Sequence, residues 1–246
     1  MTNLIEAIQN LYEIASNTFE QLRLNPDCSV DHMAAGFLYG RILETMTSCI
    51  VLLQAERDFS IPLIIRPSLD AYVDLILLAN DPDYVKNMRA NELKEKNKLL
   101  SKSIKGGEDN EFLNDIGKMD SAPRMLQEGI DELRKLREEG RIPLRADERF
   151  DMAGLKNLYP SVFARLSGHI HNDMSILKFR YLHLEKDGFK IKHSRKLSEN
   201  ELCLYLDTIC MICAAGLQTI YKILGIEENT KLIETVSALG KVRLNW

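Results

Sequence analysis

The chain has 246 residues, of which 45% are hydrophobic and 28% charged, a composition typical of globular proteins and unlike that of disordered ones. Its 13 glycines and 7 prolines make up about 8% of the chain, below the ~12% usual in proteins. Few helix-breaking residues favour long helices and argue against a collagen-like, linker-rich or all-β protein. A formal charge of −4 shows no excess that would by itself indicate a nucleic acid or a membrane as partner.

Helical periodicity dominates the first half of the chain. Apolar residues spaced three and four apart from Leu4 to Phe19 predict an amphipathic first helix. Further helices are expected at about 30–55, 61–80, 82–106, 110–117 and 122–139, each next to a capping or breaking residue. Pro67 lies inside the third of these and is expected to kink it.

The second half of the chain mixes helix with a short β segment. Residues 141–150 are predicted to be irregular. Asp151 is expected to cap a helical stretch that continues to about His171, with a break at Tyr159-Pro160 as the alternative. Alternating residues on both sides of Asp187-Gly188 then predict a β-hairpin at about 178–196. A capping box of Ser198 and Glu201 starts a long helix that stops at Gly225, and a final helix is expected at about 227–239.

These elements predict an all-α helical bundle with a small β-hairpin inserted before the last two helices. No repeat or linker divides the chain, so residues 1–246 are expected to form a single domain. Met1–Phe19 lacks the features of a signal peptide, and the longest apolar-leaning run without charges has 14 residues, short of the ~18–20 that span a bilayer. Five cysteines, an odd number, favour reduced thiols and a cytoplasmic protein.

Familiar cofactor and metal motifs are absent from the sequence. It contains neither of the two glycine-rich phosphate loops, G-x-x-x-x-G-K and G-x-G-x-x-G. It also lacks the G-x-S-x-G motif of serine hydrolases and the H-E-x-x-H motif of zinc proteases. Cys210 and Cys213 form a lone C-x-x-C inside an apolar helical run, which favours two core residues over a redox site. No cofactor and no metal are therefore expected.

The stretch from Tyr159 to Asp173 is the richest in chemically active side chains. Arg165 and His169 are four residues apart and would share a helix face, whereas His171 would lie about 120° around an unbroken helix from Arg165. Fraying at Gly168 would let His171 turn back toward Arg165. Alternatively, these residues only end a helix, where basic side chains satisfy free carbonyl groups.

Arg165-x₅-His171 resembles the R-x₄₋₆-H signature of the HEPN superfamily of all-helical proteins. Two further segments resemble motifs of an uncharacterised bacterial HEPN-like family. One is Arg66-Pro-Ser-Leu-Asp70-Ala71, which is similar to R-S-x-x-E-A, and the other runs from Tyr159 to His171 and is similar to Y…L-S-x-x-x-H. The resemblance covers roughly residues 42–171.

The resemblance implies a compact helical bundle, often dimeric, with the arginine and histidine in a cleft at the dimer interface. Many HEPN proteins are metal-independent endoribonucleases, and others bind only nucleotides or partners. Histidine suits removal of the proton from a 2′-hydroxyl, and guanidinium suits the charge on phosphate. His171, or its competitor His169, would thus be the acid or base, and Arg165 the phosphate clamp. Leu166 departs from the pattern, because HEPN nucleases commonly carry a polar residue after the arginine.

Neighbouring residues are assigned supporting roles on the same resemblance. Ser167 and Asn172 would position phosphate or histidine, and Tyr159 belongs to the same motif. Asp70, one turn after Arg66, would orient His171 or pair with Arg165. A simple ion pair between Arg66 and Asp70 is the alternative.

Two segments are locally basic despite the negative total. Residues 178–196 hold seven basic and two acidic residues, interleaved with aromatics, and residues 86–105 have the same balance. Lys178, Arg180, Lys190 and Lys192 are the candidate RNA contacts on the first segment. Alternatively, the alternating residues of 178–196 form strands with one solvated face and one packed face. The basic residues of 86–105 are likewise explained by an exposed charged helix without a ligand.

The sequence therefore predicts an HEPN-like protein that acts as a metal-independent endoribonuclease or RNA-binding effector of a bacterial defence or toxin system. A homodimer without membrane contact is expected. The alternative is a non-catalytic helical module for dimerisation or for binding a nucleotide or partner.

Overall fold

A computed structural model describes residues 2–22, 28–106, 110–171, 173–192 and 196–225. The described residues are 79% helical, and they contain ten α-helices and one two-stranded hairpin. The predicted all-α class with a small hairpin is thus confirmed. The chain divides into two compact units, a first unit of Met1–Asn80 with Arg149–Trp246 and a second unit of Asp81–Glu148. The single domain over 1–246 stays a prediction.

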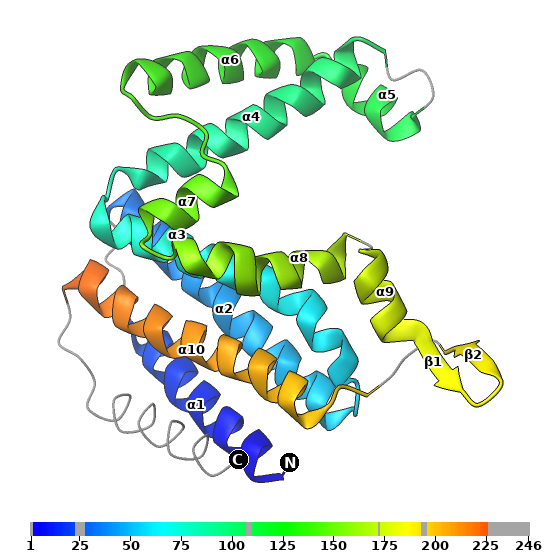
Figure 1. Cartoon of the computed structure of the whole chain (residues 1–246). Coiled ribbons are helices and arrows are strands. Elements are labelled where there is room, and N and C mark those ends of the chain that lie inside the picture. The colour runs from blue at the N-terminus through cyan, green and yellow to red at the C-terminus, as the bar shows by residue number, and fades with distance from the viewer. Residues whose placement is uncertain (1, 23–27, 107–109, 172, 193–195, 226–246) are drawn as a thin grey trace. The chain divides into compact units, whose positions relative to one another are not determined.

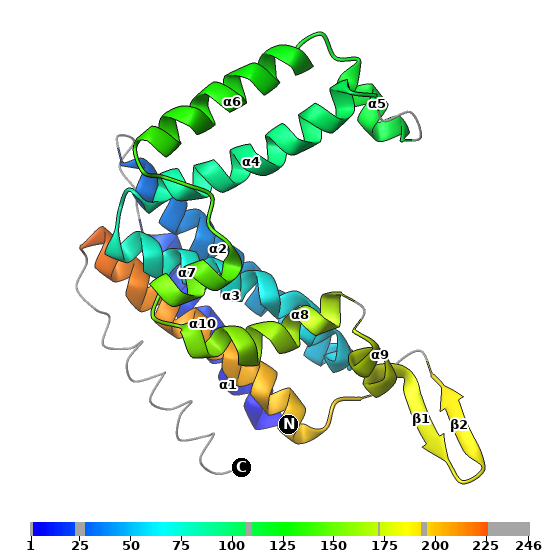
Figure 2. The same ribbon diagram turned by 45° about the horizontal axis from the view of Figure 1, so that its top comes forward.

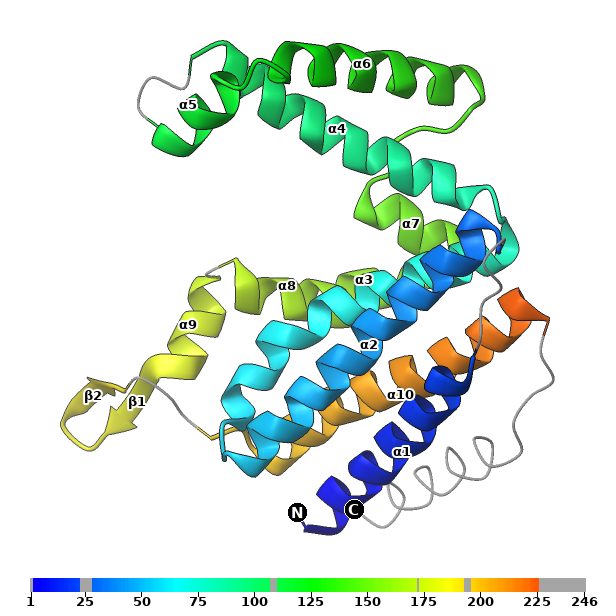
Figure 3. The same cartoon turned by 180° about the vertical axis from the view of Figure 1, so that it is seen from behind.

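Long helices lying side by side form the core of the first unit (Figures 1 and 3). They are α1 (Thr2–Gln21), α2 (Val30–Gln54), α3 (Ile61–Asn80) and α10 (Glu199–Leu224). Tyr39 on α2 is fully buried, and its hydroxyl donates a hydrogen bond of 3.0 Å to the carbonyl oxygen of Cys213 on α10. This bond satisfies the polar end of a side chain whose ring otherwise packs among apolar residues.

The ends of these helices follow the capping signals in the sequence. The Ser198 hydroxyl accepts from the Glu201 backbone N–H, and the Glu201 carboxylate accepts from the Ser198 backbone N–H in return. Gly225 adopts a φ of +64°, which ends α10 at little steric cost because glycine has no Cβ. Helix α3 continues through Pro67 without interruption. The helix expected at 227–239 lies outside the described residues.

Two helices lie where the sequence predicts irregular or strand structure. Helix α7 (Ala146–Met152) begins inside the segment expected to be irregular, where the Glu148 carboxylate accepts the Arg145 backbone N–H at 2.6 Å. Helix α9 (Met174–Tyr181) includes residues assigned to the hairpin, because Asp173 accepts from the backbone N–H groups that start the helix. Local capping therefore outweighs the alternation of side chains in residues 179–181.

The hairpin itself is shorter than predicted and projects beyond the helices of the first unit (Figure 2). Strands β1 (Leu182–Glu185) and β2 (Gly188–Ile191) pair antiparallel, with Glu185 opposite Gly188. After the hairpin the chain returns to the corner between α2 and α3, where the Asp58 carboxylate accepts the Leu197 N–H at 3.0 Å. Asp58 opens a short 3₁₀ helix, Asp58–Ser60, and is almost fully buried.

The second unit consists of α4 (Tyr84–Ile104), α5 (Glu111–Gly117) and α6 (Ala122–Glu138). Ala90, Leu93, Leu133 and Leu136 form a buried apolar cluster between α4 and α6. The basic run of residues 86–105 lies on α4, where Arg89 donates two bonds of 2.7 and 2.8 Å to Glu132 of α6. Part of that charge is therefore neutralised within the unit.

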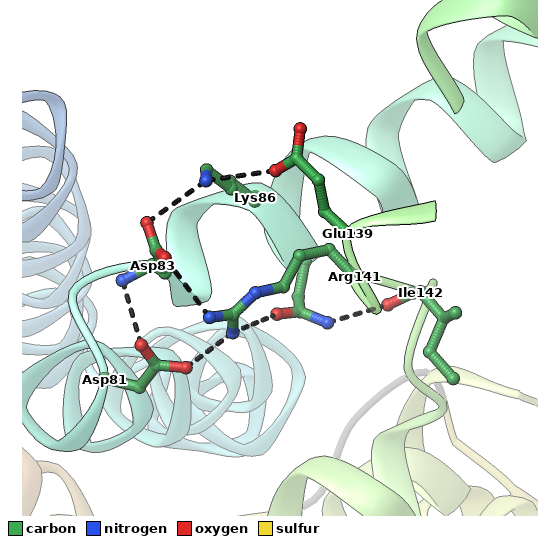
Figure 4. A network of polar contacts seen from close by, with 7 residues as sticks. Asp81, Asp83, Lys86, Glu139, Arg141 and Ile142 are labelled. Carbon is green, nitrogen blue, oxygen red and sulfur yellow. Dashed lines mark hydrogen bonds and ion pairs between the residues drawn. The ribbon is translucent and has the colours of Figure 1, made fainter. Parts of the chain in front are cut away.

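A polar network joins the start of α4 to the segment that follows α6 (Figure 4). Its members are Asp81, Asp83, Lys86, Asn87, Glu139, Arg141 and Ile142. Arg141 lies 2.5 Å from the Asp81 carboxylate, and its hydrogen bond lowers the pKa of that carboxyl group. The Asn87 amide donates to the carbonyl oxygen of Ile142 at 3.0 Å.

Gly117→Ala is expected to destabilise the second unit by about 1–3 kcal/mol. A Cβ at this position would lie 2.3 Å from the backbone oxygen of Ser103, so α4 and α5 would have to separate. Gly40→Ala is the matched control, because a Cβ there meets nothing within 4 Å and alanine favours a helix by roughly 0.5–1 kcal/mol. Urea unfolding followed by circular dichroism should show a lower free energy of unfolding for Gly117→Ala and a higher one for Gly40→Ala. Equal changes in the two variants would contradict the close packing at Gly117.

Helices α2 and α10 are long and apolar enough to cross a membrane by length and composition alone. About half of each apolar window is buried inside the structure, 44% for α2 and 56% for α10, as in core helices of a bundle. Cys213 of the C-x-x-C is fully buried, and burial raises the pKa of its thiol to about 12. A neutral buried thiol fits the predicted core role for Cys213, whereas Cys210 is half-buried. Cytoplasmic localisation stays a prediction.

Candidate functional site

The segment with the predicted site residues runs antiparallel along α3. Three contacts follow one another: Arg149 with Asp74, Phe163 with Arg66, and Arg180 with Phe59. The first is an ion pair of 2.7 Å, and the other two place a guanidinium carbon 4.7 and 5.8 Å from a ring centroid. These contacts lie before and after helix α8 (Ala164–Ile170) in the sequence. They therefore hold both ends of α8 against the region of α3.

A π-helical turn, Tyr159–Phe163, leads into α8. Tyr159 stacks on Phe163 with ring centroids 5.0 Å apart, and both rings contact Phe150 of α7 edge-on. Tyr159, which belongs to the predicted motif, therefore lies in an aromatic cluster. This cluster fixes the orientation of α8 and so the direction of the side chains that follow on it.

Arg165 and His169 share a face of α8 and meet at Tyr205 of α10. The Arg165 Nε donates to the Tyr205 hydroxyl oxygen at 3.1 Å, and the His169 Nε2 lies 3.0 Å from the same oxygen. His169 and Tyr205 are buried, with 6% and 3% exposed, whereas Arg165 is exposed. The spacing of four predicted for a shared face is thus observed, with a partner from a distant helix.

Arg180 closes the cluster from the other side of His169. Its Nη1 lies 3.4 Å from the His169 Nδ1, and its guanidinium lies near the rings of Phe59 and Tyr181. Only 8% of Arg180 is exposed. Its prediction as a surface RNA contact is therefore wrong, because α9 extends to Tyr181 and turns this side chain inward.

The environment of His169 keeps its imidazole neutral. Burial, followed by the positive charges of Arg180 and Arg165, lowers the pKa of His169 to about 4, and Glu201 opposes the shift. Both ring nitrogens also lie beside a polar partner. A buried, neutral and doubly engaged histidine is poorly suited to proton transfer at pH 7, so the structure favours a positioning role for His169 over the predicted acid–base role.

His171 follows α8 as its C-cap residue and is exposed. Its backbone N–H donates to the Ser167 carbonyl oxygen at 3.0 Å. In the described part of the chain its side chain has no polar partner. Because His171 is six positions after Arg165, the two side chains would lie about 120° apart around an ideal helix. In the described part of the chain no hydrogen bond joins the side chains of Arg165 and His171.

Asp70 and Arg66, two residues with predicted supporting roles, lie on α3 and contact residues other than His171. Asp70 accepts a hydrogen bond of 2.8 Å from Arg149. Among the described residues, no hydrogen bond or ion pair joins Asp70 to Arg165 or His171, the partners predicted for it. Burial raises the pKa of Asp70, and the charges of Arg149 and Arg66 oppose this. The alternative ion pair between Arg66 and Asp70 is not found among the described residues, because the Arg66 guanidinium lies on the Phe163 ring.

Two of these residues carry buried polar atoms without a partner in the described ranges. They are the Nε of Arg66 and the hydroxyl of Ser167. Ser167 is four residues after Phe163 and thus lies on the side of α8 that faces α3. Asn172 lies outside the described residues.

The predicted basic contacts other than Arg180 lie on the surface. Lys178, Lys190 and Lys192 are exposed. Because facing residues share a side of a sheet, the pairing of Leu184 with Phe189 and of His183 with Lys190 puts Phe189 and Lys190 on opposite faces of the hairpin. Leu184 and Phe189 are 84% and 71% exposed, so the apolar face is not packed, contrary to the alternative interpretation.

Sequence reasoning missed Tyr205 entirely. Tyr205 is 40 residues from Arg165 and belongs to the apolar pattern of α10, which marks it only as a core residue. The available signal was indirect, since a histidine buried on a helix face requires a polar partner on the facing helix. Among the described residues, no group of three or more His, Cys, Asp or Glu is placed to hold a metal ion.

Comparison with known proteins identifies a family for this chain. The chain matches no curated protein and no solved structure. The model of a family of unknown function, DUF5677, matches residues 32–190, a range that includes α3, the second unit, α8 and most of the hairpin. Because that range covers more than half of the chain, the protein belongs to the DUF5677 family of unknown function.

Proposed function

We propose that this protein is an HEPN-like RNA-binding protein in which Arg165 contacts phosphate. One observation carries the proposal: an exposed guanidinium is held through its Nε by a buried tyrosine. In the described part of the chain no hydrogen-bond partner is found for its two terminal nitrogens, which leaves them available for a ligand. Such a preorganised fork matches the oxygens of phosphate and loses little side-chain entropy on binding.

Helix α9 and the hairpin supply further contacts to an RNA strand. Lys178, Lys190 and Lys192 are exposed near the end of the segment that carries Arg165, and they attract the phosphate backbone. Phe189 offers an exposed ring on which an unpaired base can stack. Contacts of this kind favour single-stranded RNA, whose bases are accessible.

Metal-independent RNA cleavage is the second candidate function, and His171 is the observation that favours it. It is exposed and, within the described ranges, its side chain is free of polar partners, so it can exchange a proton with a 2′-hydroxyl. Cleavage requires it near Arg165 of another chain, because the two diverge on one helix. We therefore propose a homodimer in which the α8 helices of two copies approach each other. A cytoplasmic defence or toxin role is proposed by analogy with the HEPN superfamily.

Arg165→Ala is expected to weaken the binding of a fluorescein-labelled single-stranded RNA by roughly tenfold, the loss of one charge-assisted contact. The slope of log K against log salt should also fall by about 1. Fluorescence anisotropy in EDTA at several salt concentrations measures both quantities. Arg124→Ala removes an exposed arginine of α6 and is the matched control. Equal affinities of the two variants would contradict the proposed phosphate contact.

Cleavage is tested in the same samples by electrophoresis of the RNA. His171→Ala should abolish cleavage, and His169→Asn should retain part of it if His169 only positions Arg165 through Tyr205. Binding without cleavage by the wild-type protein would eliminate the nuclease and identify a non-catalytic binding module. Equal cleavage by wild type, Arg165→Ala and His171→Ala would indicate a contaminating nuclease.

A further inference from the structure

Helix α2 carries large apolar side chains on its exposed side. Val30, Phe37 and Val51 are 60%, 77% and 56% exposed. They lie along one line of the helix, because the seven and fourteen residues that separate them are close to whole numbers of helical turns. A solvated helix face normally carries polar and charged residues, so this line of apolar residues points to a contact with another molecule.

The residues between these three complete a regular pattern. Steps of four and three residues alternate along the exposed side, which is the spacing of the seam between two paired helices. From the first to the last position the seam extends over about 32 Å, at the rise of an α-helix. We name this set the α2 stripe, and its members are Val30, Ala34, Phe37, Arg41, Glu44, Ser48 and Val51.

Two charged residues at the middle of the α2 stripe determine the orientation of a partner helix. Within one chain the Arg41 Nη1 lies 3.4 Å from the Glu44 carboxylate, yet 55% and 69% of the two side chains stay exposed. An antiparallel second copy of α2 would place each Arg41 opposite the Glu44 of the other chain. A parallel copy would place like charges opposite each other, which is unfavourable.

Side-chain sizes match in the same antiparallel register. Phe37 lies opposite Ser48 of the other copy, and Val51 lies opposite Ala34, so each large residue meets a small one. This alternation lets two helices pack closely along their whole seam. The surface is thus complementary to itself in both charge and size, as a two-fold symmetric dimer requires.

We propose that two copies of this chain associate through the α2 stripe, with their α2 helices antiparallel. Figures 1 and 3 show α8 and α2 on opposite faces of the first unit. Pairing through α2 therefore leaves α8 and Arg165 accessible. The inference goes beyond the proposed function and does not depend on RNA binding.

The test uses two charge variants of the full chain in the absence of RNA. Glu44→Arg makes the middle of the α2 stripe wholly positive, and Arg41→Glu makes it wholly negative. Each variant should associate with itself at least about tenfold more weakly than the wild type, because like charges then face each other. A mixture of the two should associate about as tightly as the wild type, because every arginine again faces a glutamate. Energy transfer between donor-labelled and acceptor-labelled chains measures the four dissociation constants.

The mixture separates a contact between chains from an effect within one chain. Association that is lost in both variants and restored on mixing supports the antiparallel pair. Loss that mixing does not restore overturns the inference, because the charges then act within each chain. Equal association in all four samples also overturns it, as does a wild-type protein that stays monomeric at about 100 μM.

Phe37→Ser tests the apolar part of the α2 stripe. It should weaken self-association by about tenfold or more, since each dimer would bury two of these rings. Phe112→Ser is the matched control, because Phe112 is 67% exposed on α5, outside the stripe, and it should leave association unchanged. Equal losses in the two variants would contradict a specific surface on α2. Thermal unfolding followed by circular dichroism checks that both variants fold.

Discussion

Phe150→Ala is expected to lower the free energy of unfolding by about 3–5 kcal/mol, the range found for removal of a buried aromatic ring. Phe150 is fully buried, and its ring lies 4.9 Å from that of Phe163 and 5.6 Å from that of Tyr159. Its removal leaves a cavity beneath the π-helical turn and takes away the support of α8. Urea denaturation followed by circular dichroism measures the change.

Phe189→Ala provides the matched control for this experiment. It removes the same ring from the same unit, but Phe189 is 71% exposed, so the expected change is within about 0.5 kcal/mol. The Phe150→Ala protein should also lose RNA affinity, because Arg165 is no longer held in place. A loss of stability below about 1 kcal/mol would show that Phe150 does not belong to a packed core.

The stability of the protein is expected to fall between pH 6.5 and 4 because of His169. Burial, Arg180 and Arg165 lower the pKa of His169 to about 4 in the folded state, against 6.5 for an ordinary histidine. As the pH falls, the unfolded chain therefore takes up a proton before the folded one does. The stabilisation is fully present above pH 6.5 and is lost as the pH approaches 4, by up to about 3 kcal/mol.

His169→Asn removes this titration and should give a flatter profile over the same range, although its stability at pH 7 is lower. The informative quantity is the difference in unfolding free energy between wild type and His169→Asn at each pH. Carboxylates such as Glu201, which acts on His169, are present in both proteins and cancel in that difference. His171→Asn removes an exposed histidine and should parallel the wild type. Chemical denaturation at half-unit steps of pH measures the profiles, and parallel profiles for wild type and His169→Asn would refute the depressed pKa.

Most of the fold follows from signals that act within a few residues. The Ser198–Glu201 capping box and Gly225 bound α10 because their interactions are local, and Asp187-Gly188 marks the hairpin for the same reason. Helix α9 was missed because the apolar alternation after Lys178 competes with the Asp173 cap, and the cap prevails. Helix α7 was missed because its seven residues include only one buried aromatic, Phe150.

The candidate site could be predicted only in part. The spacing of Arg165 and His169 gives a shared face, since both lie on one helix. What this face meets depends on how α8 packs against α10, and that packing depends on contacts between residues far apart in sequence. The inward turn of Arg180 and the role of Tyr205 therefore had no local signal. Asp70 shows the same limit, because its partner Arg149 is 79 residues away.

The π-helical turn Tyr159–Phe163 has a consequence for how this segment tolerates insertions and deletions. A π turn contains one residue more than an α turn would need. Deleting one residue there would restore ordinary α-helical hydrogen bonding, but it would rotate everything before the turn by about 100° relative to Arg165 and His169. Phe150 and Tyr159 could not then both keep their contacts with Phe163. Members of the family should therefore conserve the length of this turn more strictly than its amino-acid identities.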